Sequence, residues 1–143
     1  MDTIRDNYVI STDKAKLDVS YIHQYLCFQS YWAGNIPIDI VRQSIEGSLC
    51  FGLFDGEKQI GFARMVTDAA TFAFLADVFV DEKYRGKGIG KKLIQHAIDW
   101  SLKQKIFKLR VRTQTKRLDA LQFYRSLKFE EVKEQKVFQL ELA

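Results

Sequence analysis

The sequence predicts a single α/β domain over residues 1–143, with a mixed and mainly antiparallel central sheet of about six to seven strands flanked by about four helices. Two apolar runs joined at Asp55-Gly56 predict an antiparallel hairpin. A strand, a helix and another strand follow between Phe72 and Arg112, and a crossover of this kind makes its two strands parallel. We therefore expect one sheet that contains one parallel pair.

The composition indicates a soluble, folded chain. Of its 143 residues, 47% are hydrophobic and 28% are charged, and the formal net charge is +4. So mild a charge is weak support for a nucleic-acid partner. The first residues lack the apolar core of a signal peptide and no apolar run reaches the length of a membrane span, so we expect a cytoplasmic protein without a membrane partner. Cys27 and Cys50 lack metal-ligand spacing, and we expect no metal.

Two helices are predicted in the first third of the chain, after a short strand at Tyr8–Ser11. A capping cluster, S-T-D at residues 11–13, precedes apolar residues at helical spacing. A second helix is expected from Pro37 to Gly47. The break between the helices carries Tyr31 and Trp32, which either close the turn onto the core or line a ligand pocket. The pocket is favoured, because neither ring is needed for the apolar face of a helix.

The stretch R-G-K-G-I-G at residues 85–90 has the properties of an anion-binding loop. It follows a run at Phe72–Val80 that is apolar except for Asp77, and it opens an amphipathic helix. The start of a helix leaves amide groups unpaired and carries partial positive charge, and glycines let a phosphate approach those amides. Lys87, Lys91 and Lys92 add cations where a helix usually has acids. The alternative is a solvated basic turn with no ligand.

Known nucleotide loops fit this stretch poorly. A Walker loop ends in Lys followed by Ser or Thr, whereas lysine is followed by lysine here, and the third glycine of the dinucleotide fingerprint is replaced by Lys91. Arg85, Gly88 and Gly90 instead resemble the R-x-x-G-x-G loop of the GNAT superfamily, the acyl-CoA-dependent N-acetyltransferases. The resemblance is to a bacterial branch of that family with poorly defined acceptors.

A second segment, at residues 118–129, resembles the A-x-x-F-Y-x-x-x-G-F segment of the same family. The matching positions are Ala120, Phe123, Tyr124 and Phe129. Lys128 stands where the family usually has glycine, and Arg117 where it often has asparagine. The resemblance implies that Tyr124 is a catalytic residue, whose phenol donates a proton to the departing thiolate. By periodicity alone, a core aromatic residue beside Phe123 is the favoured interpretation of Tyr124.

The resemblance implies acetyl-CoA as the cosubstrate and acetyl transfer to a primary amine by direct attack on the thioester. In the family, the loop amides hold the pyrophosphate of coenzyme A, and the preceding strand pairs with pantetheine where it splays from the next strand. The cofactor-binding residues implied for this chain are Val78, Phe79, Val80, Arg85, Gly86, Lys87, Gly88, Ile89, Gly90 and Lys91. Tyr31 and Trp32 would border the acceptor, whose identity as a small molecule or a protein stays open.

Asp77 and Arg64 are charged residues within apolar strands. A buried carboxylate is costly unless it is paired or faces a cleft. Asp77 therefore either forms a salt bridge, with Arg110 or Arg112 as the expected partner, or acts catalytically by binding the acceptor ammonium or by serving as a base. Both interpretations stay open. Arg64 either binds substrate in the cleft or lies on the solvated side of its strand, and the second placement is favoured.

Two other functions compete with catalysis. A non-catalytic acyl-CoA-binding module on the same fold would bind acetyl-CoA without transferring its acetyl group. A basic nucleic-acid-binding domain would show salt-dependent affinity for RNA or DNA, and it ranks last because the basic residues cluster at one loop. The alternating segment at residues 130–142 predicts two closing strands, and strands at the edges of the sheet leave a homodimer open.

Overall fold

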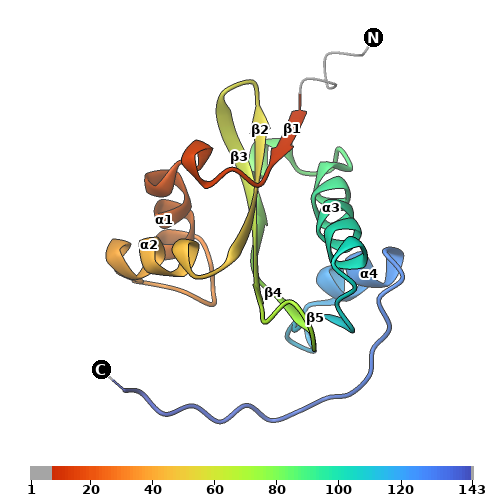
Figure 1. The fold of residues 1–143 in the computed structure, drawn as a ribbon. Coiled ribbons are helices and arrows are strands. Elements are labelled where there is room, and N and C mark those ends of the chain that lie inside the picture. Colours follow the sequence, from red (N-terminus) through yellow and green to blue (C-terminus); the bar gives the residue numbers. More distant parts are fainter. Residues whose placement is uncertain (1–7, 143) are drawn as a thin grey trace. The chain divides into compact units, whose positions relative to one another are not determined.

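The computed structural model describes residues 8–142 and divides the chain into two compact units, Met1–Arg112 and Thr113–Ala143 (Figure 1). The elements of the first unit are β1 (Tyr8–Ser11), α1 (Val19–Phe28), α2 (Ile38–Glu46), β2 (Leu49–Asp55), β3 (Lys58–Thr67), β4 (Ala73–Val80), α3 (Ile89–Lys103) and β5 (Leu109–Val111), with short 3-10 turns at Lys14–Lys16 and Glu82–Tyr84. The second unit contains α4 (Leu118–Ser126).

The sheet of the first unit has five strands in the order β1-β2-β3-β4-β5. The first three pairings are antiparallel, and the predicted hairpin between β2 and β3 turns at Gly56, whose φ is 61°. β4 and β5 form the predicted parallel pair, but only Ala73–Leu75 and Leu109–Val111 are paired. The parallel pair is therefore confirmed, and it is shorter than the sequence predicts.

Helices cover both faces of this sheet (Figure 1). α1 and α2 lie on one face, where the buried side chains form a cluster of Ile22, Leu26, Val41, Ile45, Cys50, Phe62 and Phe79. α3 lies on the other face, with Leu93, Ile94 and Ala97 fully buried. Ser101 of α3 contacts Met65 of β3 at 3.9 Å between hydroxyl and sulfur. Two separate apolar layers thus hold the sheet between the helices.

A β-bulge at Ala76 changes the side to which β4 directs its residues. Arg64 pairs with Asp77, whereas the next residue, Met65, pairs with Leu75, so Ala76 has no partner in β3. Paired residues of antiparallel strands share a face, and successive residues of one strand alternate. Met65 faces α3, so Leu75 does too, and Asp77 is turned to the face of α1 and α2. The extra residue is what places a carboxylate on that face.

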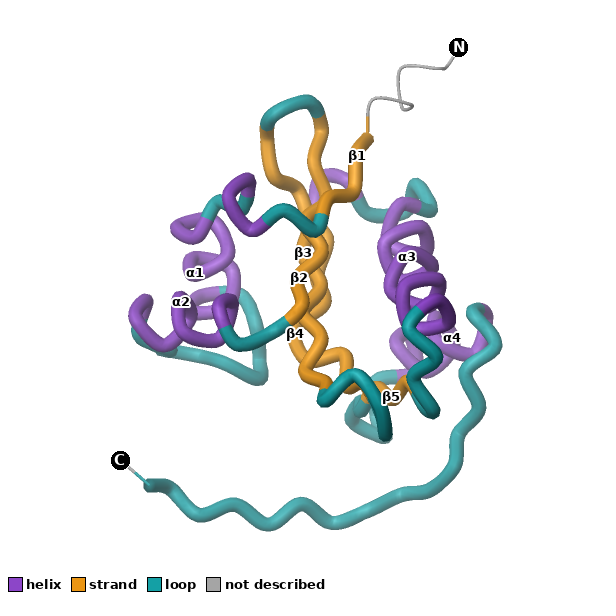
Figure 2. Tube along the Cα trace, in the orientation of Figure 1, coloured by secondary structure: helices purple, strands orange, loops and turns teal. Residues whose placement is uncertain are grey.

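The second unit differs from the prediction at its end. No strand is present at residues 130–142, and Figure 2 shows this segment as loop. The prediction of two closing strands is therefore wrong, which leaves five strands in the described chain instead of six or seven. Alternation marks one face of a segment, but a strand also needs a partner edge for its backbone hydrogen bonds, and this segment has none.

Helix α4 ends in a left-handed turn at Lys128, a conformation that is strained for a residue other than glycine. Lys128, which replaces the usual glycine, has a φ of 73°, in the left-handed region. The Lys128 amide donates to the carbonyl of Arg125 at 3.0 Å and the Phe129 amide to that of Tyr124 at 3.1 Å. The helix therefore ends in the left-handed turn that glycine normally makes.

No helix within residues 8–142 combines the length and the apolar character that crossing a membrane requires.

The N-terminal cap of α1 provides a test of local stability. The sequence places the cap at residues 11–13, but Asp13 caps only the short 3-10 turn, and Asp18 caps α1 by accepting from the Tyr21 amide at 3.0 Å. Asp18→Ala should lower the free energy of unfolding by about 1 kcal/mol, because an amide of the first turn loses its acceptor. Thermal unfolding would show a fall of about 4 °C in the midpoint.

Asp39→Ala is the matched control for this substitution. Asp39 lies in the first turn of α2, where its carboxylate is 83% exposed and 3.6 Å from Arg42. A surface pair of this kind contributes at most about 0.5 kcal/mol. Equal losses of unfolding free energy in the two variants would show that the Asp18 cap does not stabilise α1.

Candidate functional site

The loop between β4 and α3 contains two glycines in the left-handed region, a feature of anion-binding nests. Gly86 and Gly88 have φ values of 80° and 79°, on either side of Lys87, which is not in the left-handed region. Left-handed residues alternating with right-handed ones turn successive N–H groups toward one concave side. A Cβ at either glycine would meet no protein atom within 4 Å, so the space beside both is open.

The amide groups of this loop lack partners in the protein. Gly88 is the N-cap of α3 and provides no side-chain cap. Among the described residues, none accepts a hydrogen bond from the amides of residues 86–91. The first N–H groups of a 15-residue helix, with the positive end of its dipole, are therefore free to bind an anion. The unpartnered amides expected at this loop are present, and the binding of an anion to them remains a prediction.

The loop is basic and exposed at Lys87, and it is anchored in the core at Ile89. The first turn of α3 contains no acid. Lys87 is exposed, and its ammonium lies over the ring of Tyr84, 5.4 Å from the ring centre. Ile89 is only 3% exposed and fixes the start of the helix in the core. The loop thus has a rigid base and an exposed cationic rim.

Arg85 holds the loop against the end of β4. Its Nε donates to the carbonyl of Val80 at 2.9 Å, and one Nη donates to the hydroxyl of Tyr25 at 3.1 Å. Tyr25 is stacked on Phe79, with 3.8 Å between the ring centres. Sequence reasoning missed Tyr25, because it lies 60 residues from Arg85 and periodicity assigns it only to the apolar face of α1.

The end of β4 offers a free backbone edge beside this loop. On one side, residues 77–80 pair with β3. On the other side, no described residue of the first unit pairs with β4 after Leu75. The Phe79 side chain is 4% exposed within the core, so only its main chain is available to a ligand. Val78 and Val80 alternate with it and are half-buried.

Asp77 forms the predicted salt bridge, but with a different partner. Its Oδ2 accepts from Nε of Arg64 at 2.7 Å, and the side chains are 9% and 18% exposed. The assignment of Arg110 or Arg112 as the partner is wrong, because their guanidinium groups lie over phenylalanine rings instead. The favoured placement of Arg64 on the solvated side of its strand is also wrong. The bulge turns Asp77 toward Arg64, and local sequence does not show this.

Trp32 completes this arrangement. Its indole Nε1 donates to Oδ1 of Asp77 at 2.7 Å, and Tyr31 lies edge-on to the indole at 5.1 Å between ring centres. Tyr31 is 52% exposed and Trp32 38% exposed. Arg64 also donates to the hydroxyl of Ser48 at 2.9 Å, a contact that the sequence does not indicate. Trp32, Arg64 and Asp77 are thus brought together on the α1/α2 face.

Tyr124 belongs to the second unit. It lies in the last turns of α4, with its ring edge-on to Phe123 at 5.1 Å and to Phe129 at 5.5 Å. These contacts fix the ring plane within its own unit. The catalytic role of Tyr124 remains a prediction.

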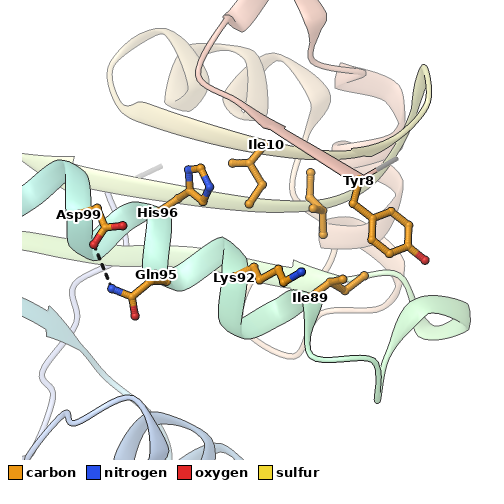
Figure 3. A pocket seen from close by; sticks show the side chains of 8 residues that line it. Tyr8, Ile10, Ile89, Lys92, Gln95, His96 and Asp99 are labelled. Carbon is orange, nitrogen blue, oxygen red and sulfur yellow. Dashed lines mark hydrogen bonds between the residues drawn. The ribbon is translucent and has the colours of Figure 1, made fainter. Parts of the chain in front are cut away.

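A pocket of about 380 Å³ lies between α3 and the β1 side of the sheet (Figure 3). It is lined by Tyr8, Ile10, Leu53, Ile89, Lys92, Gln95, His96 and Asp99. Gln95 donates to Asp99 at 3.0 Å on its rim. Ile89 is the one lining residue that belongs to the predicted cofactor set.

Two buried groups near the α1/α2 face stay protonated at neutral pH. Burial raises the pKa of the Cys50 thiol to about 11. Burial, and next the Asp81 carboxylate, raise the pKa of the Tyr21 phenol. Within the described residues, no group of three or more His, Cys, Asp or Glu side chains is placed to hold a metal ion.

Comparison with known proteins gives consistent matches. The family model described as "Acetyltransferase (GNAT) family" matches residues 18–129. A relative from Gibberella zeae is 32% identical over 110 residues, which cover 64% of this chain and 62% of the relative. A crystal structure of a Xanthomonas campestris protein belonging to the GNAT family is 34% identical, covers 91% of this chain and 93% of its own, and superposes with a TM-score of 0.79.

A GNAT family acetyltransferase from Elizabethkingia anophelis, solved with acetyl-CoA bound, shares the fold. Its TM-score is 0.68 at 19% identity, with 85% of this chain and 75% of that chain covered. The chain spans about three fifths of the length of the Gibberella relative, as the 62% coverage shows. The family model covers the loop, the Asp77 contacts and Tyr124.

Proposed function

Because the chain belongs to the acetyltransferase (GNAT) family, we propose that it is an acetyl-CoA-dependent N-acetyltransferase that acetylates a primary amine. The observation that carries this proposal is the row of unpartnered amides at residues 86–91, in the glycine loop that opens α3. A pyrophosphate matches this feature, because it supplies several anionic acceptors to several adjacent donors.

The residues of the first unit fit coenzyme A on grounds of space and charge. No protein atom would contact a Cβ at Gly86 or Gly88, so a phosphate can reach the backbone there. Lys87 and Lys91 add positive charge at the rim, and Arg85 keeps the loop closed against Val80. The free edge of β4 at Val78–Val80 would hold the pantetheine arm by main-chain hydrogen bonds.

Each residue has one role in the proposed reaction. Bound acetyl-CoA supplies the activated acetyl group as a thioester. The backbone of β4 near the bulge orients that group, and the exposed rings of Tyr31 and Trp32 border the acceptor amine. The Tyr124 phenol donates a proton to the departing sulfur, which is typically worth about 10²–10⁴ in rate. We propose that water removes the proton from the acceptor ammonium, because both Asp77 oxygens already accept hydrogen bonds.

A thiol-release assay tests this function. The chain is incubated with acetyl-CoA and a panel of primary amines that includes amino sugars, polyamines, amino acids and lysine peptides. We expect free thiol to appear only with certain amines, and mass spectrometry to show one added acetyl group on each. Protein alone corrects for Cys27 and Cys50. Calorimetric binding of acetyl-CoA without transfer to any amine would support a non-catalytic module instead, and absence of binding would reject both.

A further inference from the structure

Three side chains join the loop between α1 and α2 to the centre of the sheet. The Asp77 carboxylate accepts from the Trp32 indole through Oδ1 and from Arg64 through Oδ2, both at 2.7 Å. Hydrogen bonds of this kind, with an ionised acceptor, are about twice as strong as neutral ones. Trp32 and Asp77 are 45 residues apart in the sequence. The contact therefore fixes the position of one segment relative to another.

The loop at residues 29–37 is already ordered by its own bonds, and Figure 2 shows it as the connection between α1 and α2. The Ser30 hydroxyl donates to the Leu26 carbonyl at 2.7 Å and accepts from the Ala33 amide at 3.1 Å. His23 donates through Nε2 to the Ile36 carbonyl at 3.0 Å. These bonds tie the loop to α1. The Trp32 indole adds a bond to β4.

We infer that Asp77 is a positioning residue, which holds Trp32 and Arg64 so that the exposed Tyr31–Trp32 edge keeps its place beside the β4 bulge and binds the acceptor. This inference rests on the proposed function, since it assigns the acceptor side of that site. Asp77 follows the bulge residue Ala76 directly, so one short segment carries both the free backbone edge and the carboxylate that fixes the loop.

The geometry disfavours the alternative role of Asp77 as a base or as a ligand of the acceptor ammonium. Each carboxylate oxygen already accepts a short hydrogen bond, and the guanidinium of Arg64 balances its charge. The Asp77 side chain is also only 9% exposed. What this part of the chain presents to solvent is the aromatic surface of Tyr31 and Trp32. The acceptor would therefore meet ring faces and edges here, instead of a free negative charge.

Trp32→Phe tests the inference while leaving the ion pair of Arg64 and Asp77 intact. Phenylalanine retains an aromatic ring but has no N–H to donate. We expect the KM for the acceptor to rise about tenfold, because a hydrogen bond to a charged group is lost. The kcat and the Kd for acetyl-CoA should change less than about threefold. Trp100→Phe, the same substitution in α3, is the control and should leave the acceptor KM unchanged.

Asp77→Asn tests the other end of the contact. In an asparagine side chain an NH2 group replaces one of the two carboxylate oxygens and cannot accept a hydrogen bond, and the charged Arg64 forms the stronger bond to the oxygen that remains. We expect the acceptor KM to rise as it does in Trp32→Phe. The double variant should be no worse than either single variant, since both release the same loop. A fall of about 10² or more in kcat for Asp77→Asn at unchanged KM, with a shifted pH profile, would instead make Asp77 a base and overturn the inference.

A spectroscopic test separates this inference from the proposed function. The chain has two tryptophans, so Trp32 is the sole indole fluorophore in a Trp100→Phe background. Adding Asp77→Asn should shift the Trp32 emission to longer wavelength and increase its quenching by acrylamide. Unchanged emission and quenching would overturn the positioning role, whatever reaction the protein catalyses. Absence of acetyl transfer by the native chain would reject the proposed function and leave this measurement valid.

Discussion

Tyr124→Phe should lower kcat by a factor of about 10² to 10⁴ and leave the Kd for acetyl-CoA nearly unchanged. The substitution removes the hydroxyl and keeps the ring, so the edge-on contacts with Phe123 and Phe129 can persist. Expulsion of a thiolate is the step that a proton donor assists. A phenol hydroxyl is a proton donor and can supply that proton. Steady-state kinetics with a reactive amine, together with calorimetry, would measure both quantities.

Tyr8→Phe is the matched control for this substitution. Tyr8 lies in β1 and packs edge-on against Tyr84, with 6.1 Å between the ring centres. It belongs to neither the loop nor the acceptor side, so its hydroxyl should not affect turnover. Equal turnover in Tyr124→Phe and the native chain would remove Tyr124 from the mechanism. A loss of acetyl-CoA affinity in Tyr124→Phe would indicate a binding role instead.

Gly88→Ala should raise the Kd for coenzyme A by on the order of ten- to a hundredfold. The residue has a φ of 79°, and holding an alanine in that region costs roughly 1–2 kcal/mol. If the loop relaxes to avoid this cost, amides of residues 86–91 turn away from the ligand. Losing one hydrogen bond to a charged group costs about 1.5–3 kcal/mol, and 1.4 kcal/mol corresponds to tenfold in affinity. Titration calorimetry with coenzyme A checks the result.

Gly56→Ala separates strain from ligand binding. Gly56 has a φ of 61° in the turn between β2 and β3, and a Cβ there would also meet nothing within 4 Å. Both glycine variants should lose about 1 kcal/mol of unfolding free energy, which thermal or denaturant unfolding measures. Only Gly88→Ala should change the affinity for coenzyme A. The same Kd in both variants would contradict the role of the loop.

The parts of the fold that were predicted correctly are those with local signals. The hairpin at Asp55-Gly56, the crossover that makes β4 and β5 parallel, and the loop that opens α3 each depend on a few adjacent residues. The resulting GNAT-like α/β fold is confirmed by its match to the Xanthomonas structure. The unpartnered amides at residues 86–91 follow from the glycines and the helix start alone.

The parts that were missed depend on contacts distant in sequence. Whether Arg64 faces solvent or Asp77 is decided by the bulge at Ala76, because one extra residue reverses the face of all that follows. The alternation at residues 130–142 predicts strands, yet a strand requires a partner edge that no local pattern provides. The contact of Tyr25 with Arg85 likewise joins residues that only the folded chain brings together.

Because Ala76 has no partner in β3, the residues of β4 before it and after it alternate between the two faces of the sheet in opposite order. With Ala76 present, the Leu75 side chain faces α3 while the Asp77 side chain faces α1 and α2. In a chain with Ala76 deleted, either Leu75 or Asp77 would point to the wrong face of the sheet. An extra residue at the exposed turn near Gly56 would change the face of neither. Gains and losses of one residue should therefore be tolerated at the hairpin tip and rejected in the middle of β4.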